Sequence, residues 1–126
     1  MVNYLRRLVD VPAFSNIPLP GHAGSKVVNK ILIDPVTGSQ NFMLLWASAE
    51  PGSETALHTH PVEQAYFVLS GELLFRMAGV EHKVGSDTAV LIPSGMEHGL
   101  EIVSREAARV LTIFAPPLPE FASRPH

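Results

Sequence analysis

The sequence predicts an all-β fold, a sandwich or barrel of short strands, and three observations lead to this prediction. From Val27 onward, short β-type runs alternate with turn signals. Almost no segment has the 3.6-residue periodicity of an amphipathic helix. The length of 126 residues suits one domain with its own core. We therefore expect a single-domain, all-β protein.

The composition supports a folded chain and excludes several functions. Hydrophobic residues make up 46% and charged residues 17%, which argues against disorder. The net charge of −3 and the scattered Lys and Arg residues provide no basic surface for nucleic acid. Because the chain has no cysteine, a transition metal would need nitrogen and oxygen ligands, with imidazoles as the leading candidates.

The sequence also lacks the features of membrane targeting. Its first ten residues, MVNYLRRLVD, do not contain the apolar run of a signal peptide. No stretch approaches the roughly 18 consecutive apolar residues of a membrane span. We expect a cytoplasmic protein without a membrane partner.

The first 26 residues are expected to form an irregular arm. Three prolines and two glycines interrupt this segment and prevent a long regular element. Such an arm can cover a sheet edge or cross to a second subunit, so we expect a homodimer. Tyr4, Leu5 and Leu8 are the expected docking residues, while Arg6 and Arg7 are expected to be solvated.

The remaining chain divides into short strands and a proline-rich tail. Strands are expected at residues 27–33, 41–48, 57–60, 64–70, 72–78, 80–84, 88–92, 98–104 and 108–115. We place the arm and first edge strand at residues 1–35, the barrel at 36–117 and the tail at 118–126. Alternating residues of 42–46 and of 73–77 should face the interior, but the pattern leaves open which ones do.

Two histidines provide the first sign of a functional site. His58 and His60 are one residue apart on the strand expected at 57–60, so both should point to the same face. Their spacing of about 6 to 7 Å along the backbone would let them hold one cation. Taken alone, such a pair is more typical of surface or hydrogen-bonded histidines.

A metal held by this pair needs further ligands, and four other histidines are available. His22 lies in the arm, His82 on a short polar strand and His126 at the end of the tail, so we expect all three to be solvated. His98 differs because it opens a strand directly after a Pro-Ser-Gly turn, where a side chain can face a cavity. It is the best candidate for a third ligand.

The spacing of these residues forms a two-part pattern. It reads Gly52-x5-His58-x-His60-x3-Gln64-x6-Gly71, followed by Gly85 and Pro93-Ser94-Gly95-x2-His98. This pattern, within residues 40–115, resembles the two motifs of the cupin family. The resemblance implies a jelly-roll barrel, also called a double-stranded β-helix, that holds a metal through three histidines and usually a glutamate. Matched by position, the three histidines are His58, His60 and His98.

The fourth ligand position departs from the family pattern. Gln64 stands where the family usually has glutamate, and Glu63 is its neighbour. Because strand side chains alternate, only one of the two can face the interior. The spacing to Gly71 favours Gln64, while a bulge could bring Glu63 inward instead. A second departure is Ile102, where the family often has asparagine, so we expect an apolar wall there.

An amide in place of a carboxylate would change the chemistry of the metal. Three imidazoles and one amide leave a divalent ion with its full +2 charge, which favours anionic or chelating oxygen ligands. The expected cofactor is one divalent transition metal, namely manganese, iron, nickel or zinc. The candidate catalytic groups are Glu63 and Tyr66, the latter on the same strand face as Gln64.

These expectations support three functional hypotheses. The first is a metal-dependent enzyme acting on a small oxygen-rich or anionic molecule, with dioxygenation favoured over isomerisation, lysis or hydrolysis. The second is a non-catalytic domain that binds or senses a small molecule. The third is a structural barrel whose histidines have no important ligand. The fold is compatible with all three and selects none.

Overall fold

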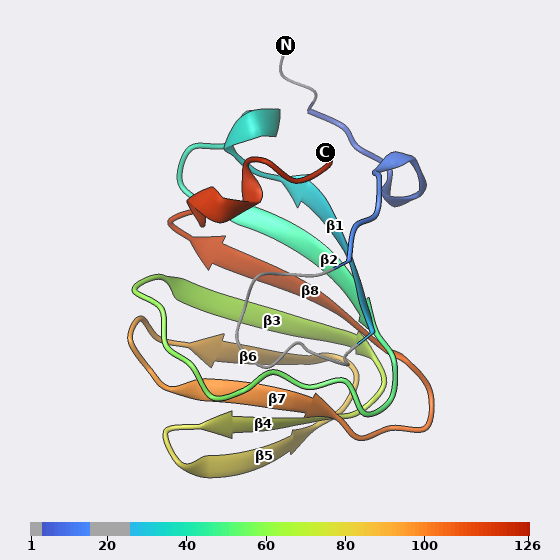
Figure 1. Ribbon diagram of the computed structural model, residues 1–126, viewed down its shortest axis with the longest axis vertical. Coiled ribbons are helices and arrows are strands. Elements are labelled where there is room, and N and C mark those ends of the chain that lie inside the picture. Colours follow the sequence, from blue (N-terminus) through green and yellow to red (C-terminus); the bar gives the residue numbers. More distant parts are fainter. Residues whose placement is uncertain (1–3, 16–25) are drawn as a thin grey trace.

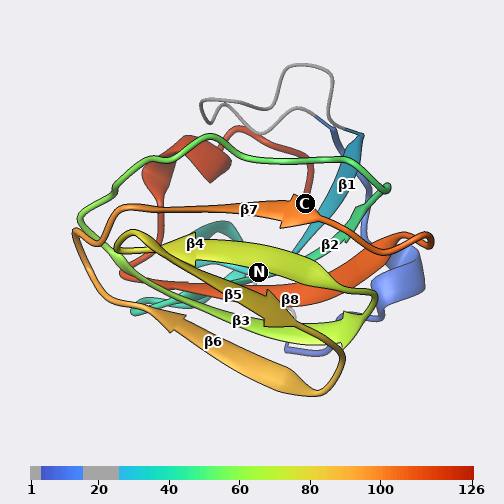
Figure 2. The same ribbon diagram turned by 90° about the horizontal axis from the view of Figure 1, so that it is seen from below.

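Two antiparallel sheets form the body of the protein in a computed structural model that describes residues 4–15 and 26–126 (Figures 1 and 2). The strands are β1 (Val27–Ile33), β2 (Met43–Ala49), β3 (Glu63–Ser70), β4 (Leu73–Met77), β5 (Val80–Val84), β6 (Thr88–Ile92), β7 (His98–Ile102) and β8 (Ala108–Ala115). Three single-turn 3₁₀ helices complete the described elements: η1 (Leu8–Asp10), η2 (Pro35–Thr37) and η3 (Pro119–Phe121).

The strand order is that of a jelly roll. One sheet has the order β1-β2-β8-β3-β6 and the other the order β5-β4-β7. Strands that are distant in sequence, such as β2 and β8, are neighbours in the larger sheet. From β3 onward the chain crosses repeatedly between the two sheets, for example from β3 to β4 and from β6 to β7. The prediction of an all-β jelly-roll barrel is confirmed. None of the described residues belongs to a helix long and apolar enough to cross a membrane.

Most expected strands are present, but the strand expected at 57–60 is wrong. This segment is an extended connection between β2 and β3 that touches β7 at an isolated bridge between His58 and His98. The two residues exchange backbone hydrogen bonds of 2.9 and 3.0 Å. Pro61 follows closely and has no N–H to donate, which prevents a continuous ladder.

Alternation along the strands determines which side chains form the interior. On β2, Met43 and Leu45 are buried with at most 1% exposed surface. On β4, Leu73 and Phe75 are buried to the same extent. The sequence left open which residues of 42–46 and 73–77 face the interior, and these four residues do so. Two buried clusters fill the barrel, one around Phe75 and one toward the C-terminal segment.

The N-terminal arm docks through different residues from those expected. Tyr4, Leu5 and Leu8 are exposed, the first two at 90% and 87%. Val11 and Phe14 are buried instead, and Phe14 forms a bridge with β1. Within one chain the sheet edge is therefore covered by Val11 and Phe14, because hydrophobicity alone does not reveal which arm residues reach that edge. Docking of Tyr4, Leu5 and Leu8 on a second subunit stays a prediction. The part of the arm that contains His22 lies outside the described residues.

Two residues that we expected to be solvated make specific contacts. The Nη1 of Arg6 donates to the carbonyls of Ile31 and Leu32 at 3.0 and 3.1 Å. His126 Nε2 lies 2.6 Å from the buried Asp34 Oδ2, and the His126 side chain is 12% exposed. Both contacts join distant parts of the chain, which local sequence patterns do not predict. His82, by contrast, is exposed on β5 as expected.

The C-terminal tail packs into the barrel. Leu118 is 8% exposed and Phe121 is 1% exposed. The Phe121 ring lies between Phe14 of the arm and Phe114 of β8, with centroid distances of 6.4 and 6.3 Å. In Figure 1 the arm and the tail both lie near β1. Together they close this end of the interior.

Candidate metal centre and cavity

Three imidazoles are oriented by hydrogen bonds between their Nδ1 atoms and backbone carbonyls two residues away. The pairs are His58 with Ala56 (2.8 Å), His60 with Val62 (2.9 Å) and His98 with Met96 (2.9 Å). Since a carbonyl only accepts hydrogen bonds, each Nδ1 carries the proton in the neutral ring. Each Nε2 therefore presents a lone pair, which is the tautomer that a metal requires.

The three rings meet although they come from two separate segments. His58 and His60 lie in the connection between β2 and β3, and His98 is the first residue of β7. Their potential ligand atoms all lie within 4.8 Å of one another. The backbone bridge between His58 and His98 fixes the two segments side by side. The geometry brings together the three histidines that the sequence singled out.

The His98 ring has a buried nitrogen without a partner. His98 is 2% exposed, and its Nε2 accepts no hydrogen bond from any residue that the structure describes. Leaving such an acceptor buried and unpaired costs free energy. A metal ion bound between the three rings would satisfy it, so the local chemistry fits a metal.

The Gln64 side chain approaches the same point. Its Oε1 lies 2.9 Å from His60 Nε2. The Thr112 hydroxyl donates to the Ala65 carbonyl at 3.1 Å, so it accepts from the Gln64 amide nitrogen at 3.2 Å. This contact directs Oε1 toward His60. Two acceptors then face each other, an arrangement that a cation between them would stabilise.

Burial distinguishes Gln64 from its neighbour. Gln64 is 4% exposed on the inner face of β3, whereas Glu63 is exposed and does not line the cavity. No bulge brings Glu63 inward, because both residues are in regular register with β8. The donor set near His60 is thus three imidazole nitrogens and one amide oxygen, all neutral. Such a set suits the divalent metals considered above.

Burial also changes the pKa of the His98 imidazole. Removal from water lowers its pKa below the ordinary value, since the charged ring is poorly solvated. The neighbouring rings of His58 and His60 act in the same direction, while the Met96 carbonyl opposes the change. His98 therefore keeps its lone pair available at a lower pH than a solvated histidine would.

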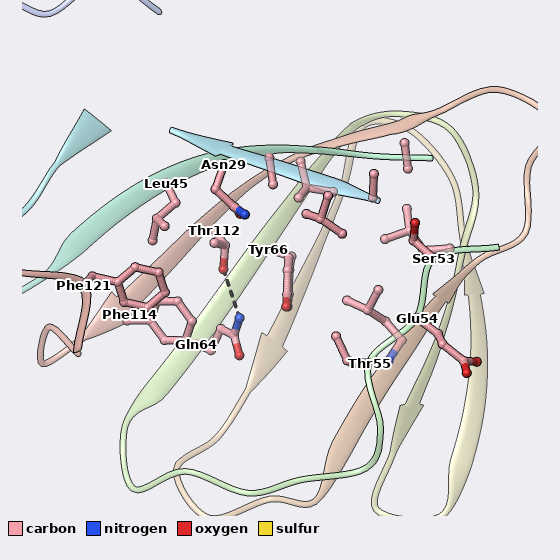
Figure 3. A pocket seen from close by; sticks show the side chains of 17 residues that line it. Asn29, Leu45, Ser53, Glu54, Thr55, Gln64, Tyr66, Thr112, Phe114 and Phe121 are labelled. Carbon is pink, nitrogen blue, oxygen red and sulfur yellow. Dashed lines mark hydrogen bonds between the residues drawn. The ribbon is translucent and has the colours of Figure 1, made fainter. Parts of the chain in front are cut away.

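A largely apolar cavity extends from Gln64 through the barrel (Figure 3). Its volume, measured as the space open to the centre of a water molecule, is about 80 Å³. The polar residues in its wall are Asn29, Ser53, Glu54, Thr55, Gln64, Tyr66 and Thr112. Its apolar lining includes Leu45, Val110, Phe114 and Phe121. An apolar space with a few polar groups is the usual form of a small-molecule site.

Tyr66 is the ionisable group that lines this cavity close to Gln64 (Figure 3). Burial raises the pKa of its hydroxyl to about 12, although a hydrogen bond with Gln64 acts in the opposite direction. Its ring packs edge-on against Phe75 at a centroid distance of 5.2 Å. Tyr66 thus keeps its proton in any neutral solution and can act as a hydrogen-bond donor.

Several wall residues were missed by sequence reasoning. Asn29 and Phe121 both line the cavity, yet one lies in an apolar strand and the other in the proline-rich tail. A polar residue between Val27 and Ile31, at the inward-facing positions of a strand, was the available signal for Asn29. Ile102 is buried in the core as an apolar residue but does not line the cavity.

Comparisons with known proteins agree with this architecture. The family model described as Cupin domain matches residues 45–114. A curated relative, the tetracenomycin polyketide synthase protein TcmJ of Streptomyces glaucescens, is 27% identical over 104 residues, covering 80% of this chain and 70% of TcmJ.

Solved structures are similar over nearly the whole chain, as two examples show. The polyketide cyclase RemF of Streptomyces resistomycificus is 28% identical, with a TM-score of 0.78, covering 94% of this chain and 82% of RemF. KdgF from a Halomonas species has the same TM-score of 0.78 at 16% identity, covering 95% of this chain and 99% of KdgF, and so shows the fold alone. The matched model, which spans more than half of the sequence, and the jelly-roll structure show that the chain belongs to the cupin family.

Proposed function

We propose that this cupin is a metal-dependent enzyme in which His58, His60, His98 and Gln64 hold one divalent transition metal. The observation that carries the proposal is the convergence of three Nε2 lone pairs, one of them buried and unpaired among the described residues. The Gln64 oxygen completes this donor set at 2.9 Å from His60. A bound divalent ion would supply Lewis-acid chemistry, polarising an oxygen of the substrate.

The reaction best supported is cyclisation of an oxygen-rich polyketide-like molecule. RemF is described as a polyketide cyclase and TcmJ as a polyketide synthase protein, and both are more than 25% identical to this chain. The mostly apolar cavity, with a few polar groups in its wall, suits a carbon skeleton with a few oxygens. Ring closure joins a nucleophilic carbon, which loses a proton, to a carbonyl carbon, whose oxygen gains one.

The residues of the chain have distinct roles in this reaction. The Tyr66 hydroxyl, kept protonated by burial, donates a hydrogen bond to the carbonyl oxygen as negative charge develops on it. Apolar wall residues such as Leu45 and Val110 hold the skeleton and exclude water. We assign no catalytic role to Glu63, since it is exposed and outside the cavity.

Dioxygenation is the second candidate, and the donor set itself favours it. Four protein ligands leave up to two positions of an octahedral ion for substrate and oxygen. Oxygen consumption separates the two reactions. A metal-loaded cyclase converts a linear poly-β-ketone to a ring without oxygen, while a dioxygenase consumes oxygen and is inactive without it. Non-catalytic binding would leave the poly-β-ketone unchanged under both conditions.

The metal proposal is tested by metal analysis of purified protein reconstituted with manganese, iron, nickel or zinc. We expect about one ion per chain in the wild type and in His82→Ala, because His82 is exposed on β5. His58→Ala and His98→Ala should lose most of the metal and keep their β-type circular dichroism. Full metal content in His98→Ala would contradict the proposal.

A homodimer is the expected assembly, and the outer face of the larger sheet is its proposed interface. Two rows of side chains cross this face: Leu44, Ile113, Ala65 and Leu91, and then Trp46, Leu111, Phe67 and Ala89. Within them Leu91 is 59% exposed, and Phe67 and Ile113 are each 40% exposed. An apolar face of this kind marks an interaction surface. The cytoplasmic location stays a prediction.

A further inference from the structure

We propose that Asn29 determines substrate specificity by donating a hydrogen bond from its side-chain Nδ2 to an oxygen of the bound molecule. The acceptor would be a carbonyl or phenolic oxygen on the part of the skeleton that is remote from the metal. This inference rests on the proposed function and deepens it, because it assigns a second polar anchor within the same cavity.

The amide of Asn29 is buried and unsatisfied. The residue is 2% exposed and lines the cavity. Its Nδ2 has no hydrogen-bond partner among the described residues. Figure 3 shows the nitrogen directed toward the space between Thr112 and Tyr66. Because buried N–H groups are nearly always paired in native proteins, this donor indicates a partner that enters the cavity from outside.

The backbone of Asn29 is fixed on both sides of β1. On one side its N–H and C=O are hydrogen bonded to Phe14, at 2.8 and 2.9 Å. On the other side Asn29 pairs with Ala47 of β2. The side chain is therefore committed to the interior, on the same face as Val27 and Ile31. Because β1 is held on both sides, it cannot rotate to bring the Asn29 amide into contact with water.

The immediate neighbours across the sheet offer no acceptor side chain. In the row that contains Asn29, β2 contributes Ala47 and β8 contributes Val110, both apolar. Thr112 of the next row accepts from the Gln64 amide nitrogen, and no hydrogen bond joins it to the Asn29 amide nitrogen. The described residues thus leave the Asn29 amide without an acceptor, and we assign that role to a ligand or to water that the ligand displaces.

The position of Asn29 constrains the shape of that ligand. Gln64 is paired with Phe114 of β8, and Phe114 with Met43 of β2. Asn29 pairs with Ala47, four residues further along β2 than Met43. The two ends are thus two inward-facing steps apart on β2, with Leu45 between them. A molecule that contacts both needs oxygens on different rings, as a fused-ring aromatic ketone has.

The test compares two probes for the zinc-loaded protein. Alizarin carries two adjacent phenolic oxygens that chelate a metal and a quinone carbonyl on the next ring, whereas catechol carries the phenolic pair alone. Loss of one hydrogen bond should weaken alizarin binding about 3- to 10-fold in Asn29→Ala. Asn29→Asp, which removes the donor at constant shape, should weaken it at least as much. Neither change should alter catechol binding.

Asn41→Asp provides the matched control, because Asn41 is exposed and does not line the cavity. Unchanged catechol affinity shows that a variant is folded around its metal site. If Asn29→Ala does not fold, the comparison is made with Asn29→Asp. Equal alizarin affinity in the wild type and the Asn29 variant would overturn the inference.

Failure of the metal proposal would give a different result. The protein would not retain zinc, or catechol would bind equally well with and without zinc. The alizarin comparison is therefore repeated on the zinc-free protein. Weaker binding to Asn29→Ala there would support the Asn29 contact independently of the metal, while equal binding would overturn it.

Discussion

At Gln64, a neutral amide occupies a position next to three neutral imidazoles. Its oxygen faces His60 at 2.9 Å because Thr112 holds the amide nitrogen. No carboxylate belongs to the group of potential ligands found among the described residues, His58, His60 and His98. An ion bound here would keep its full charge, which strengthens its attraction for anionic oxygens. The charge of the site therefore depends on one side chain.

Substitution at Gln64 should change metal affinity more than substitution at its neighbour. Gln64→Ala removes the oxygen beside His60 and should weaken zinc binding about 10-fold or more, on the order of the loss from removing a contact to a charged group. Glu63→Ala, at an exposed position, should have little effect. Gln64→Glu should raise zinc affinity by adding a negative charge. Competition with a chelating dye measures all three, and a larger effect of Glu63→Ala would transfer the ligand role to Glu63.

At the scale of elements, the short helix η3 has a larger role than its three residues suggest. Phe121 contributes to both the buried cluster and the cavity wall. It contacts Phe14 of the arm and Phe114 of β8, so it joins the two ends of the chain to the barrel. The tail therefore stabilises the fold and limits the length of the cavity.

Truncation of this ring should destabilise the protein strongly. Phe121→Ala removes a fully buried phenyl group and should lower the free energy of unfolding by about 3–5 kcal/mol. Phe42→Ala is the control, because the Phe42 ring is 38% exposed and its loss leaves no internal void. Urea denaturation followed by circular dichroism measures both. Equal losses in the two variants would contradict the role of Phe121.

The elements also show where sequence reasoning succeeds. Regular alternation and turn residues predicted most strands within two residues, and the motif spacing predicted which histidines meet. The segment at 57–60 was mistaken for a strand because side-chain spacing does not reveal whether a partner strand continues beside it. Contacts such as His126 with Asp34 span 92 residues, and no local pattern encodes them. Asn29 was missed because its parity with Val27 and Ile31 was not used to assign the inward face of residues 27–33.

At the scale of the whole molecule, the larger sheet has one face in the barrel and one face in solvent. The solvent face is unusually apolar at its centre, around Phe67 and Ile113. The smaller sheet carries Arg76, Glu81 and Glu101 in ion pairs instead. This difference between the sheets favours association through the larger one.

A charge in the apolar face should prevent dimer formation. Phe67→Glu places a carboxylate among the two rows and should convert a dimer to a monomer at micromolar concentration, as measured by analytical ultracentrifugation. Val80→Glu is the control, because Val80 is 54% exposed on β5 of the other sheet. A wild-type protein that sediments as a monomer would reject the dimer.

The bridge between Phe14 and Asn29 has a consequence for how this protein can evolve. The proposed metal end is built from the β2–β3 connection, β3 and β7, and the tail packs against it through Phe121 and Phe114. The Asn29 end depends on β1 and the arm. Under the roles proposed above, mutations in β1 and the arm should change ligand selection while leaving the proposed metal ligands in place. The proposed roles predict that reactivity and selectivity can change independently, so related proteins could bind different ligands with the same metal chemistry.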